Sequence, residues 1–292
     1  FQGGPGSPNE MEDGTSGMLE RHDLVMVGYR GIDGQVKLEC EELADAIASL
    51  TENWLNESAL SVYQKGGKDC VNALKSRGID MAGYTMAQTI DDMEAARQAL
   101  GYNRINVVGE SYGTRLAMIY QWRYPESLHR VLMVAVNPPG HFVFEPVAIE
   151  KLFKKYSVLC AKDAYCSSRT PDLMATLKEV STHMPESWMG IPIHRDLILM
   201  GTTFMMMESM AYPGDPVPVS GPAAIDMWLD AAEGDASGMA LASLAMPIVL
   251  SNFTGGHFYS MGLCDYQKTD RDYKNELMLP GNITGSPMSL LY

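Results

Sequence analysis

A serine stands between two glycines in the run Gly109-Glu110-Ser111-Tyr112-Gly113. A short apolar run over 104–108 precedes it, and an apolar-periodic run over 116–120 follows. This pattern predicts a strand, a sharp turn and a helix, with the Ser111 hydroxyl standing clear of the sheet at the turn. A serine held in this way has the geometry of a nucleophile for acyl transfer. The alternative is an ordinary glycine-rich turn that carries a surface serine.

A nucleophilic serine also needs donors for the oxyanion that its attack creates. The helix after Ser111 would direct its N-terminus toward this oxygen, so the Tyr112 N–H is one expected donor. A glycine-rich loop over residues 1–6 precedes the serine by about a hundred residues. A loop at that distance is where a second donor is expected, and Gly3 and Gly4 are therefore the candidates.

Four motifs in order resemble those of α/β-hydrolases of the proline iminopeptidase and tripeptidyl aminopeptidase group. They are Gly3-Gly4-Pro5-Gly6, residues 23–31 (DLVMVGYRG), Gly83-Tyr84-Thr85 and residues 109–114 (GESYGT). The resemblance is clear over about residues 1–140 and implies an α/β-hydrolase fold, a mostly parallel sheet flanked by helices with an inserted helical lid. The chain departs from the group at Gly28, where an Asp is usual. The first seven residues also resemble a protease-cleavage scar from an expression vector.

The order of predicted elements divides the chain into three parts. Residues 1–141 are expected to form the hydrolase core, with strands over 24–28, 104–108 and 128–136 and helices over 41–50, 58–65, 69–77 and 85–100. Thr85 and Gln88 predict a capping box, and Gly101 predicts the end of that helix. Residues 142–260 are expected to form a helical lid, with helices over 145–160, 171–183, 202–211, 223–232 and 238–249. Residues 261–292 would return to the core and look incomplete.

The acid and base that a serine nucleophile requires follow it in this fold in the order Ser, Asp or Glu, His. Only His257, in a glycine-rich loop, has a suitable context, and Asp230 or Asp235 would be its acid. However, residues 258–264 resemble the segment that leads from the lid back to the sheet, before the acid and base of the group. We therefore expect both residues beyond Tyr292, in a sequence that is a fragment at both ends, with His257 as base or a pseudoenzyme as the alternatives.

Two acidic residues are candidates for substrate binding. Glu208 lies among four methionines of the expected lid, 205–207 and 210, which either pack the lid or form an adaptable apolar substrate surface. A carboxylate there could hold the N-terminal ammonium group of a peptide, and an exposed helix glutamate is the alternative. Glu110, next to Ser111, is the second candidate.

Composition excludes several classes of partner. The chain has 292 residues and a formal net charge of −14, which argues against binding to nucleic acid because phosphates would be repelled. No apolar run is long enough to cross a membrane. Cys160 and Cys166 lack a histidine partner or paired CxxC spacing, which argues against zinc, and no metal or organic cofactor is implied. The expected partner is a peptide or small acyl substrate, and the sequence does not address the oligomeric state.

The five cysteines bear on the compartment. The resemblance to secreted peptidases suggests the disulfide pairs Cys160–Cys166 and Cys40–Cys70 and leaves Cys264 over. This indicates a secreted or periplasmic protein, with free buried cysteines in a cytoplasmic enzyme as the alternative. Sequons at 56, 252 and 282 would matter only in a eukaryotic secretory pathway.

Together these features predict a serine hydrolase, an aminopeptidase that releases N-terminal residues or short peptides through an acyl-enzyme on Ser111. A carboxylesterase acting on small acyl esters and a non-catalytic binding module without a full triad are the alternatives. Expressed alone, residues 1–292 are expected to aggregate and to show no turnover, because strands and the base would be missing.

Overall fold

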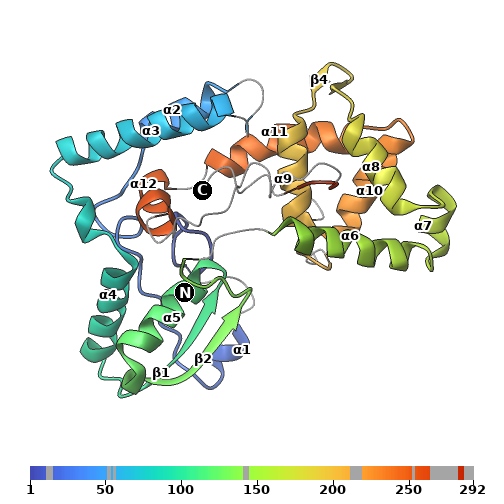
Figure 1. Ribbon diagram of the computed structural model, residues 1–292. Helices are drawn as coiled ribbons and strands as arrows, with labels where there is room; N and C mark the ends of the chain where they lie inside the picture. The colour runs from blue at the N-terminus through green and yellow to red at the C-terminus, as the bar shows by residue number, and fades with distance from the viewer. Residues whose placement is uncertain are drawn as a thin grey trace. The chain divides into compact units, whose positions relative to one another are not determined.

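The computed structural model describes residues 1–10, 16–50, 54, 57–140, 145–210, 219–251, 254–263 and 282–285. The chain divides into two compact units (Figure 1). The sheet unit comprises Phe1–Ile47, Val62–Phe142 and Ser251–Lys268, and the helical unit comprises Ala48–Ser61, Val143–Leu250 and Thr269–Tyr292. The identification of residues 142–260 as a lid and of 261–292 as a return to the core stays a prediction.

A parallel pair of strands and the helix that joins them form the centre of the sheet unit. Strand β1 (Ile105–Glu110) pairs with β2 (Leu128–Val134), and the register places Val107 opposite Val131. Helix α5 (Tyr112–Arg123) and the 3-10 turn η2 (Pro125–Ser127) make the crossover that a parallel pair requires. The strand–helix–strand order predicted from the sequence is thus present, as a small parallel sheet.

Helix α4 (Met86–Ala99) forms where the sequence predicts it. The Gln88 N–H donates to Thr85 Oγ1 and the Thr85 N–H donates to Gln88 Oε1, both at 3.3 Å, which confirms the capping box. Ile90 and Met93 are buried on one face and belong to the same apolar cluster as Leu116 of α5. Gly101 follows with φ 77°, the left-handed conformation that ends helices.

Helices α2 (Glu41–Ala48) and α3 (Glu57–Ser76) pack closely, and the sequence prediction of two helices over 58–65 and 69–77 is wrong. A single helix runs through Gly66. A Cβ at Gly66 would lie 2.8 Å from the Cβ of Ala46, so this glycine permits the close approach of α2. Cys40 and Cys70 lie at disulfide distance beside this contact, with Cα atoms 5.1 Å apart.

The strand predicted over 24–28 is also wrong, since these residues belong to no strand of the structure. The Val27 carbonyl accepts a hydrogen bond from the Asn9 side-chain amide at 2.8 Å instead of a ladder bond. Short helical turns complete the described part of the unit: α1 (Ser16–Leu19), η1 (Met81–Gly83), α12 (Gly255–His257) and the π-helical turn η3 (Phe258–Leu263).

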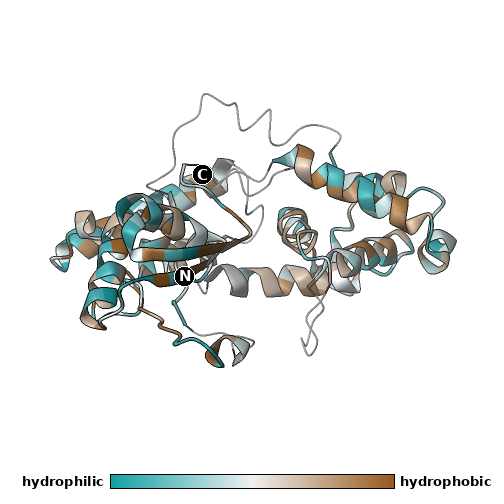
Figure 2. Ribbon diagram, turned by 90° about the horizontal axis from the view of Figure 1, so that it is seen from below, coloured by the Kyte–Doolittle hydropathy of each residue, from teal (hydrophilic) through white to brown (hydrophobic). Residues whose placement is uncertain are grey.

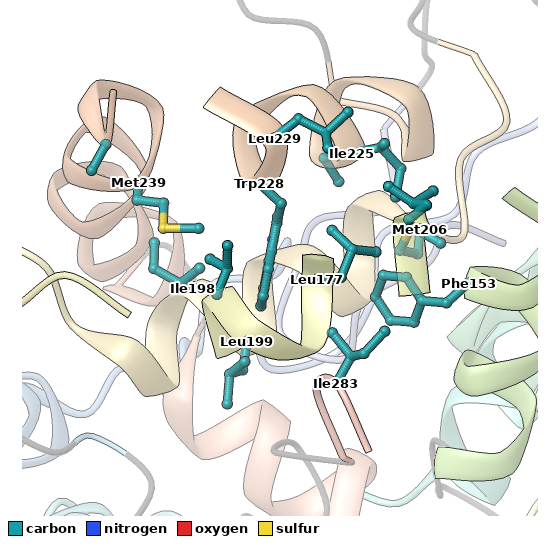
Figure 3. Close-up of a cluster of buried hydrophobic side chains, with 14 of the residues drawn as sticks. Phe153, Leu177, Ile198, Leu199, Met206, Ile225, Trp228, Leu229, Met239 and Ile283 are labelled. Carbon is teal, nitrogen blue, oxygen red and sulfur yellow. The ribbon is translucent and has the colours of Figure 1, made fainter. Parts of the chain in front are cut away.

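The helical unit contains six helices and one short hairpin in its described part. These are α6 (Pro146–Cys160), α7 (Ala164–Arg169), α8 (Leu173–Thr182), the hairpin strands β3 (Ser187–Trp188) and β4 (Ile191–Pro192), α9 (Arg195–Met205), α10 (Gly221–Ala232) and α11 (Ser237–Ser251). Hydrophilic and hydrophobic residues alternate along these helices, as Figure 2 shows. The Trp228 ring is fully buried between Ile198 and Leu177 (Figure 3), and its indole N–H donates to Thr202 Oγ1 at 2.8 Å.

In this unit the structure differs from the sequence prediction at one helix and agrees with it at one cysteine pair. The helix predicted over 202–211 is wrong, because α9 begins at Arg195 and ends at Met205. The apolar run over 197–200, which precedes the predicted start, is the buried face of α9. Cys160 and Cys166 lie at disulfide distance, with Cα atoms 5.1 Å apart, and connect α6 to α7.

Candidate active site

Ser111 occupies the turn between β1 and α5. Its backbone has φ 47° and ψ −114°, a left-handed conformation that is strained for a residue with a Cβ. The Ser111 N–H donates to the Val134 carbonyl at 2.9 Å, so the pairing of β1 with β2 continues up to the turn. A strained serine at the carboxyl end of a parallel strand is the geometry that presents a hydroxyl for attack.

The two glycines that flank Ser111 are required by packing. A Cβ at Gly109 would lie 2.5 Å from the Gly113 carbonyl oxygen, and a Cβ at Gly113 would collide with the carbonyl of Phe1. Only glycine permits both approaches. The spacing of the motif therefore has two steric causes: the tight return of α5 against the end of β1 at Gly109, and the approach of Phe1 at Gly113.

Thr114 holds the turn from inside, a role that was not predicted from the sequence. It is fully buried, and its hydroxyl donates to the Ser111 carbonyl at 2.6 Å and accepts from the Asn137 N–H at 2.8 Å. Arg115, also buried, donates to the Asn137 side chain at 3.2 Å. The sequence does contain a signal for this role, because a Thr three residues after the serine can donate a hydrogen bond from its side chain to the serine carbonyl.

The structure brings the glycine-rich loop against the turn. A Cβ built on Gly3 would lie 3.0 Å from the Ser111 Cβ and 3.8 Å from its Oγ. Gly4 follows with φ 70°, and Tyr112 is the buried first residue of α5. The three residues expected to supply oxyanion donors are therefore near Ser111 in space or adjacent in sequence, and their role as donors stays a prediction.

Side chains of the sheet unit hold the first residues of this loop. The Gln2 N–H donates to Asn9 Oδ1 at 3.0 Å, and the Tyr29 hydroxyl donates to the Gln2 carbonyl at 3.2 Å. Asp33 accepts from the N–H groups of Asn9 and Tyr29 at 3.1 and 2.7 Å. A Cβ at Gly28 would lie 2.5 Å from the Asp33 Cβ. The glycine at position 28 thus makes room for the side chain of Asp33.

The two candidate substrate-binding glutamates are both exposed. Glu110 is the last residue of β1, directly before Ser111. Glu208 lies in the helical unit, after the end of α9 rather than within a helix, and its carbonyl accepts from the Gly221 N–H at 2.7 Å. Of the methionines around Glu208, Met206 is buried in the core whereas Met210 is 71% exposed. Substrate binding by either glutamate stays a prediction.

His257 is buried in the sheet unit, and its contacts argue against a role as the base. Its Nδ1 accepts from the Gly6 N–H at 2.9 Å, so the neutral ring carries its proton on Nε2 and cannot donate from Nδ1 to an acid. Burial lowers its pKa to about 4, partly offset by Asp33. The candidate acids have other partners: Asp230 pairs with Arg169 at 2.7 Å, and Asp235 accepts from the Ser237 N–H.

Two further observations concern ligands and membranes. Within the described ranges, no three side chains of His, Cys, Asp or Glu are grouped so that they could hold a metal ion. No helix in the same ranges has the length and apolar character needed to span a bilayer.

Comparison with known proteins agrees with this geometry. The family model for the α/β hydrolase fold matches residues 64–157. The chain is 23% identical over 179 residues to "Putative hydrolase YuaR" of Escherichia coli, covering 57% of this chain and 34% of that protein. It is 25% identical over 162 residues to serine protease Hip1 of Mycobacterium tuberculosis and of Mycobacterium bovis, covering 50% of this chain and 30% of those proteins.

The chain therefore spans about a third of the length of these relatives. The matched segment contains β1, the Ser111 turn, α5 and β2. Fold, turn and comparisons agree: the segment around Ser111 matches the α/β hydrolase fold.

Proposed function

We propose that this protein is a serine hydrolase with Ser111 as its nucleophile. The observation that carries the proposal is the left-handed turn at Ser111, strained at φ 47° between β1 and α5, with Gly3 packed against its side chain. Structures keep a strained non-glycine residue where the surroundings enforce it, and such residues cluster at active sites. The name serine protease on one set of relatives supports the same reaction class.

In the proposed mechanism, Ser111 Oγ attacks the carbonyl carbon of the substrate while a histidine removes its proton. The N–H groups of Tyr112 and of Gly3 or Gly4 stabilise the oxyanion. The leaving group takes the proton from the histidine and departs, which leaves the acyl-enzyme. The histidine then removes a proton from water, the water oxygen attacks the acyl carbon, and Ser111 Oγ leaves and regains the proton. Among the described residues no histidine is hydrogen-bonded to Ser111, so the base is not assigned.

We propose that the enzyme is an aminopeptidase, whose substrates are peptides with a free N-terminus. The four motifs shared with the aminopeptidase group support it, and so does the exposed carboxylate of Glu110 beside Ser111, which could pair with a peptide ammonium group. A carboxylesterase is the second candidate, because the turn and its donors serve esters and amides alike. A binding module that lacks a complete triad is the third.

Labelling of the full-length protein with a fluorophosphonate probe tests the nucleophile. We expect a stoichiometric adduct on Ser111, loss of the adduct in Ser111→Ala, and retention in the control Ser76→Ala, an exposed serine of α3. Labelling that survives in Ser111→Ala would remove this residue from the mechanism. Turnover of aminoacyl arylamides against acyl esters then separates aminopeptidase from esterase, and labelling without either turnover favours another acyl substrate.

A further inference from the structure

The glycine-rich loop contains one tight turn whose position sets the direction of the groups near Ser111. The Ser7 N–H donates to the Gly4 carbonyl at 3.0 Å, and Gly6 has φ 100°. With Pro5 before Gly6, this is the arrangement of a type II turn. Because Gly3 contacts Ser111 and Gly4 opens the turn, any shift of the turn moves the N–H groups proposed to bind the oxyanion.

A single distant segment, 254–263, holds this turn through both the N–H and the carbonyl of one residue, Gly6. The Gly6 N–H donates to His257 Nδ1 at 2.9 Å, and the Thr254 N–H donates to the Gly6 carbonyl at 2.9 Å. Pro5 packs on the same segment, since a Cβ at Gly262 would lie 3.0 Å from Pro5 Cγ. The turn is therefore fixed by two hydrogen bonds and one close packing contact.

The imidazole of His257 is itself held rigidly. It has no exposed surface, stacks on the Tyr29 ring with centroids 6.1 Å apart, and meets the Tyr112 ring edge-on at 6.2 Å. Tyr29 also donates to the Gln2 carbonyl at 3.2 Å, so the stacked pair contacts the loop near both of its ends. Because the imidazole is held in place, its Nδ1 is a rigid acceptor that fixes the position of the Gly6 N–H.

The other ring nitrogen shows that the imidazole is not there for packing alone. His257 Nε2 is buried and has no hydrogen-bond partner among the described residues. An unpaired buried N–H costs free energy, which an apolar side chain of similar size would avoid. The group that an apolar side chain could not replace is Nδ1, the acceptor for Gly6.

We propose that His257 is a positioning residue of the oxyanion loop: its Nδ1 fixes Gly6 and thereby holds the N–H groups of Gly3 and Gly4 at Ser111. The proposal rests on the proposed role of Ser111, but the contact itself can be measured without turnover. The histidine acts as a neutral hydrogen-bond acceptor, and an acceptor at the same place should be able to replace it. Asn offers one, because its Oδ1 occupies about the position of Nδ1.

Amide hydrogen exchange of residues 3–7 in the whole chain tests the contact directly. We expect the Gly6 amide to exchange at least roughly tenfold faster in His257→Leu than in the wild type, and close to the wild-type rate in His257→Asn. His183→Leu, at a largely exposed histidine that follows α8, is the matched control and should change nothing in this segment. Equal defects in the Leu and Asn variants would show that His257 packs only, and would overturn the proposal.

A second variant guards against misfolding of His257→Leu. Thr254 has φ −68°, which proline adopts, so Thr254→Pro removes the N–H that donates to Gly6 and leaves His257 in place. We expect faster exchange at Gly6 in Thr254→Pro, whereas Thr254→Ala, which keeps the N–H, should match the wild type. Unchanged exchange in both Thr254→Pro and His257→Leu would overturn the proposal.

The consequence for catalysis is read from the rate of fluorophosphonate labelling at Ser111 in the full-length protein. Loss of an oxyanion donor in a serine hydrolase slows catalysis by about 10²–10³-fold, so a displaced loop should slow labelling by at least about tenfold in His257→Leu. His257→Asn should restore it. If the wild-type serine does not react, the proposed function fails, while the exchange data still decide whether His257 positions the loop.

Discussion

The helical and sheet units bury their apolar residues in different ways. In the helical unit one cluster around Trp228 gathers buried side chains from the helices α6 and α8–α11 (Figure 3). In the sheet unit three apolar side chains of β2 and of the chain just after it are exposed to solvent: Leu132 is 55% exposed, Val134 48% and Val136 54%. Parallel strands are normally covered on both faces, so the exposed face of β2 is unusual.

The difference teaches which interactions hold each unit. Helices bond their own backbones and need only their apolar faces packed, which the helical unit achieves. The described part of the sheet unit has buried apolar clusters too, but buried and partly buried hydrogen bonds also join its segments, such as Thr114 to Asn137, Asp33 to Tyr29 and His257 to Gly6. Truncation of the Trp228 cluster should therefore lower the stability of the helical unit, whereas acid should lower the stability of the sheet unit through His257.

The largest loss of stability is expected from Trp228→Ala. Removal of a fully buried tryptophan costs about 3–5 kcal/mol of unfolding free energy, through lost burial and the cavity left behind. Trp122→Ala, at an α5 position that is 68% exposed, is the control in the sheet unit and should change stability by less than about 0.5 kcal/mol. Urea unfolding measures both, and equal losses would show that the burial of Trp228 does not stabilise the helical unit.

The next effect concerns pH and His257. Its pKa is about 4 in the folded protein and about 6.5 when unfolded, because burial disfavours the charged form. The unfolded chain therefore binds the extra proton between these values, and stability is full above pH 6.5 and falls as pH drops toward 4. The loss approaches about 3 kcal/mol, from 1.4 kcal/mol per pH unit. The free energy of unfolding is measured against pH for the wild type and for His257→Asn, and the difference between the two curves removes the contribution of the carboxylates. The same pH dependence in both proteins would contradict the prediction.

A smaller effect is expected from the cysteine pair of the helical unit. Opening the Cys160–Cys166 loop, with a sequence separation of 6, should cost about 2 kcal/mol by chain entropy. Cys160→Ser/Cys166→Ser against the wild type under non-reducing conditions measures the loss. Rapid alkylation of both thiols in the native protein would show that no bridge forms.

The smallest change in stability, below about 0.5 kcal/mol, is expected for Leu132→Thr on β2. The same substitution should reduce aggregation of the isolated chain, because an exposed apolar strand favours association between molecules. Light scattering and urea unfolding provide the two measurements. A loss above about 2 kcal/mol would show that Leu132 is covered in solution, and the two units would then not differ in how they bury apolar residues.

Local patterns make the strand–turn–helix around Ser111 and the capped helix α4 predictable from the sequence. The features that escape prediction depend on contacts between distant residues. Two helices are predicted over 58–65 and 69–77, yet α3 is continuous through Gly66, which lies against Ala46 of α2. His257 looks like a base because of its loop context, whereas its polar partner, Gly6, lies 251 residues earlier. Spacing in sequence cannot show such a pair.

The separation of Gly6 from His257 also has a consequence for the timing of folding. The two residues are 251 positions apart, and a chain of that length takes roughly 10–50 s to synthesise at about 5–20 residues per second. During that interval the glycine-rich loop can meet Ser111 but lacks the acceptor for Gly6. Contacts of such long range also close slowly, because the entropy of a large loop must be lost first. The nascent chain thus passes through a stage in which the turn at Ser111 can form before Gly6 is fixed, so the proposed oxyanion loop is completed only after residue 257 has been synthesised.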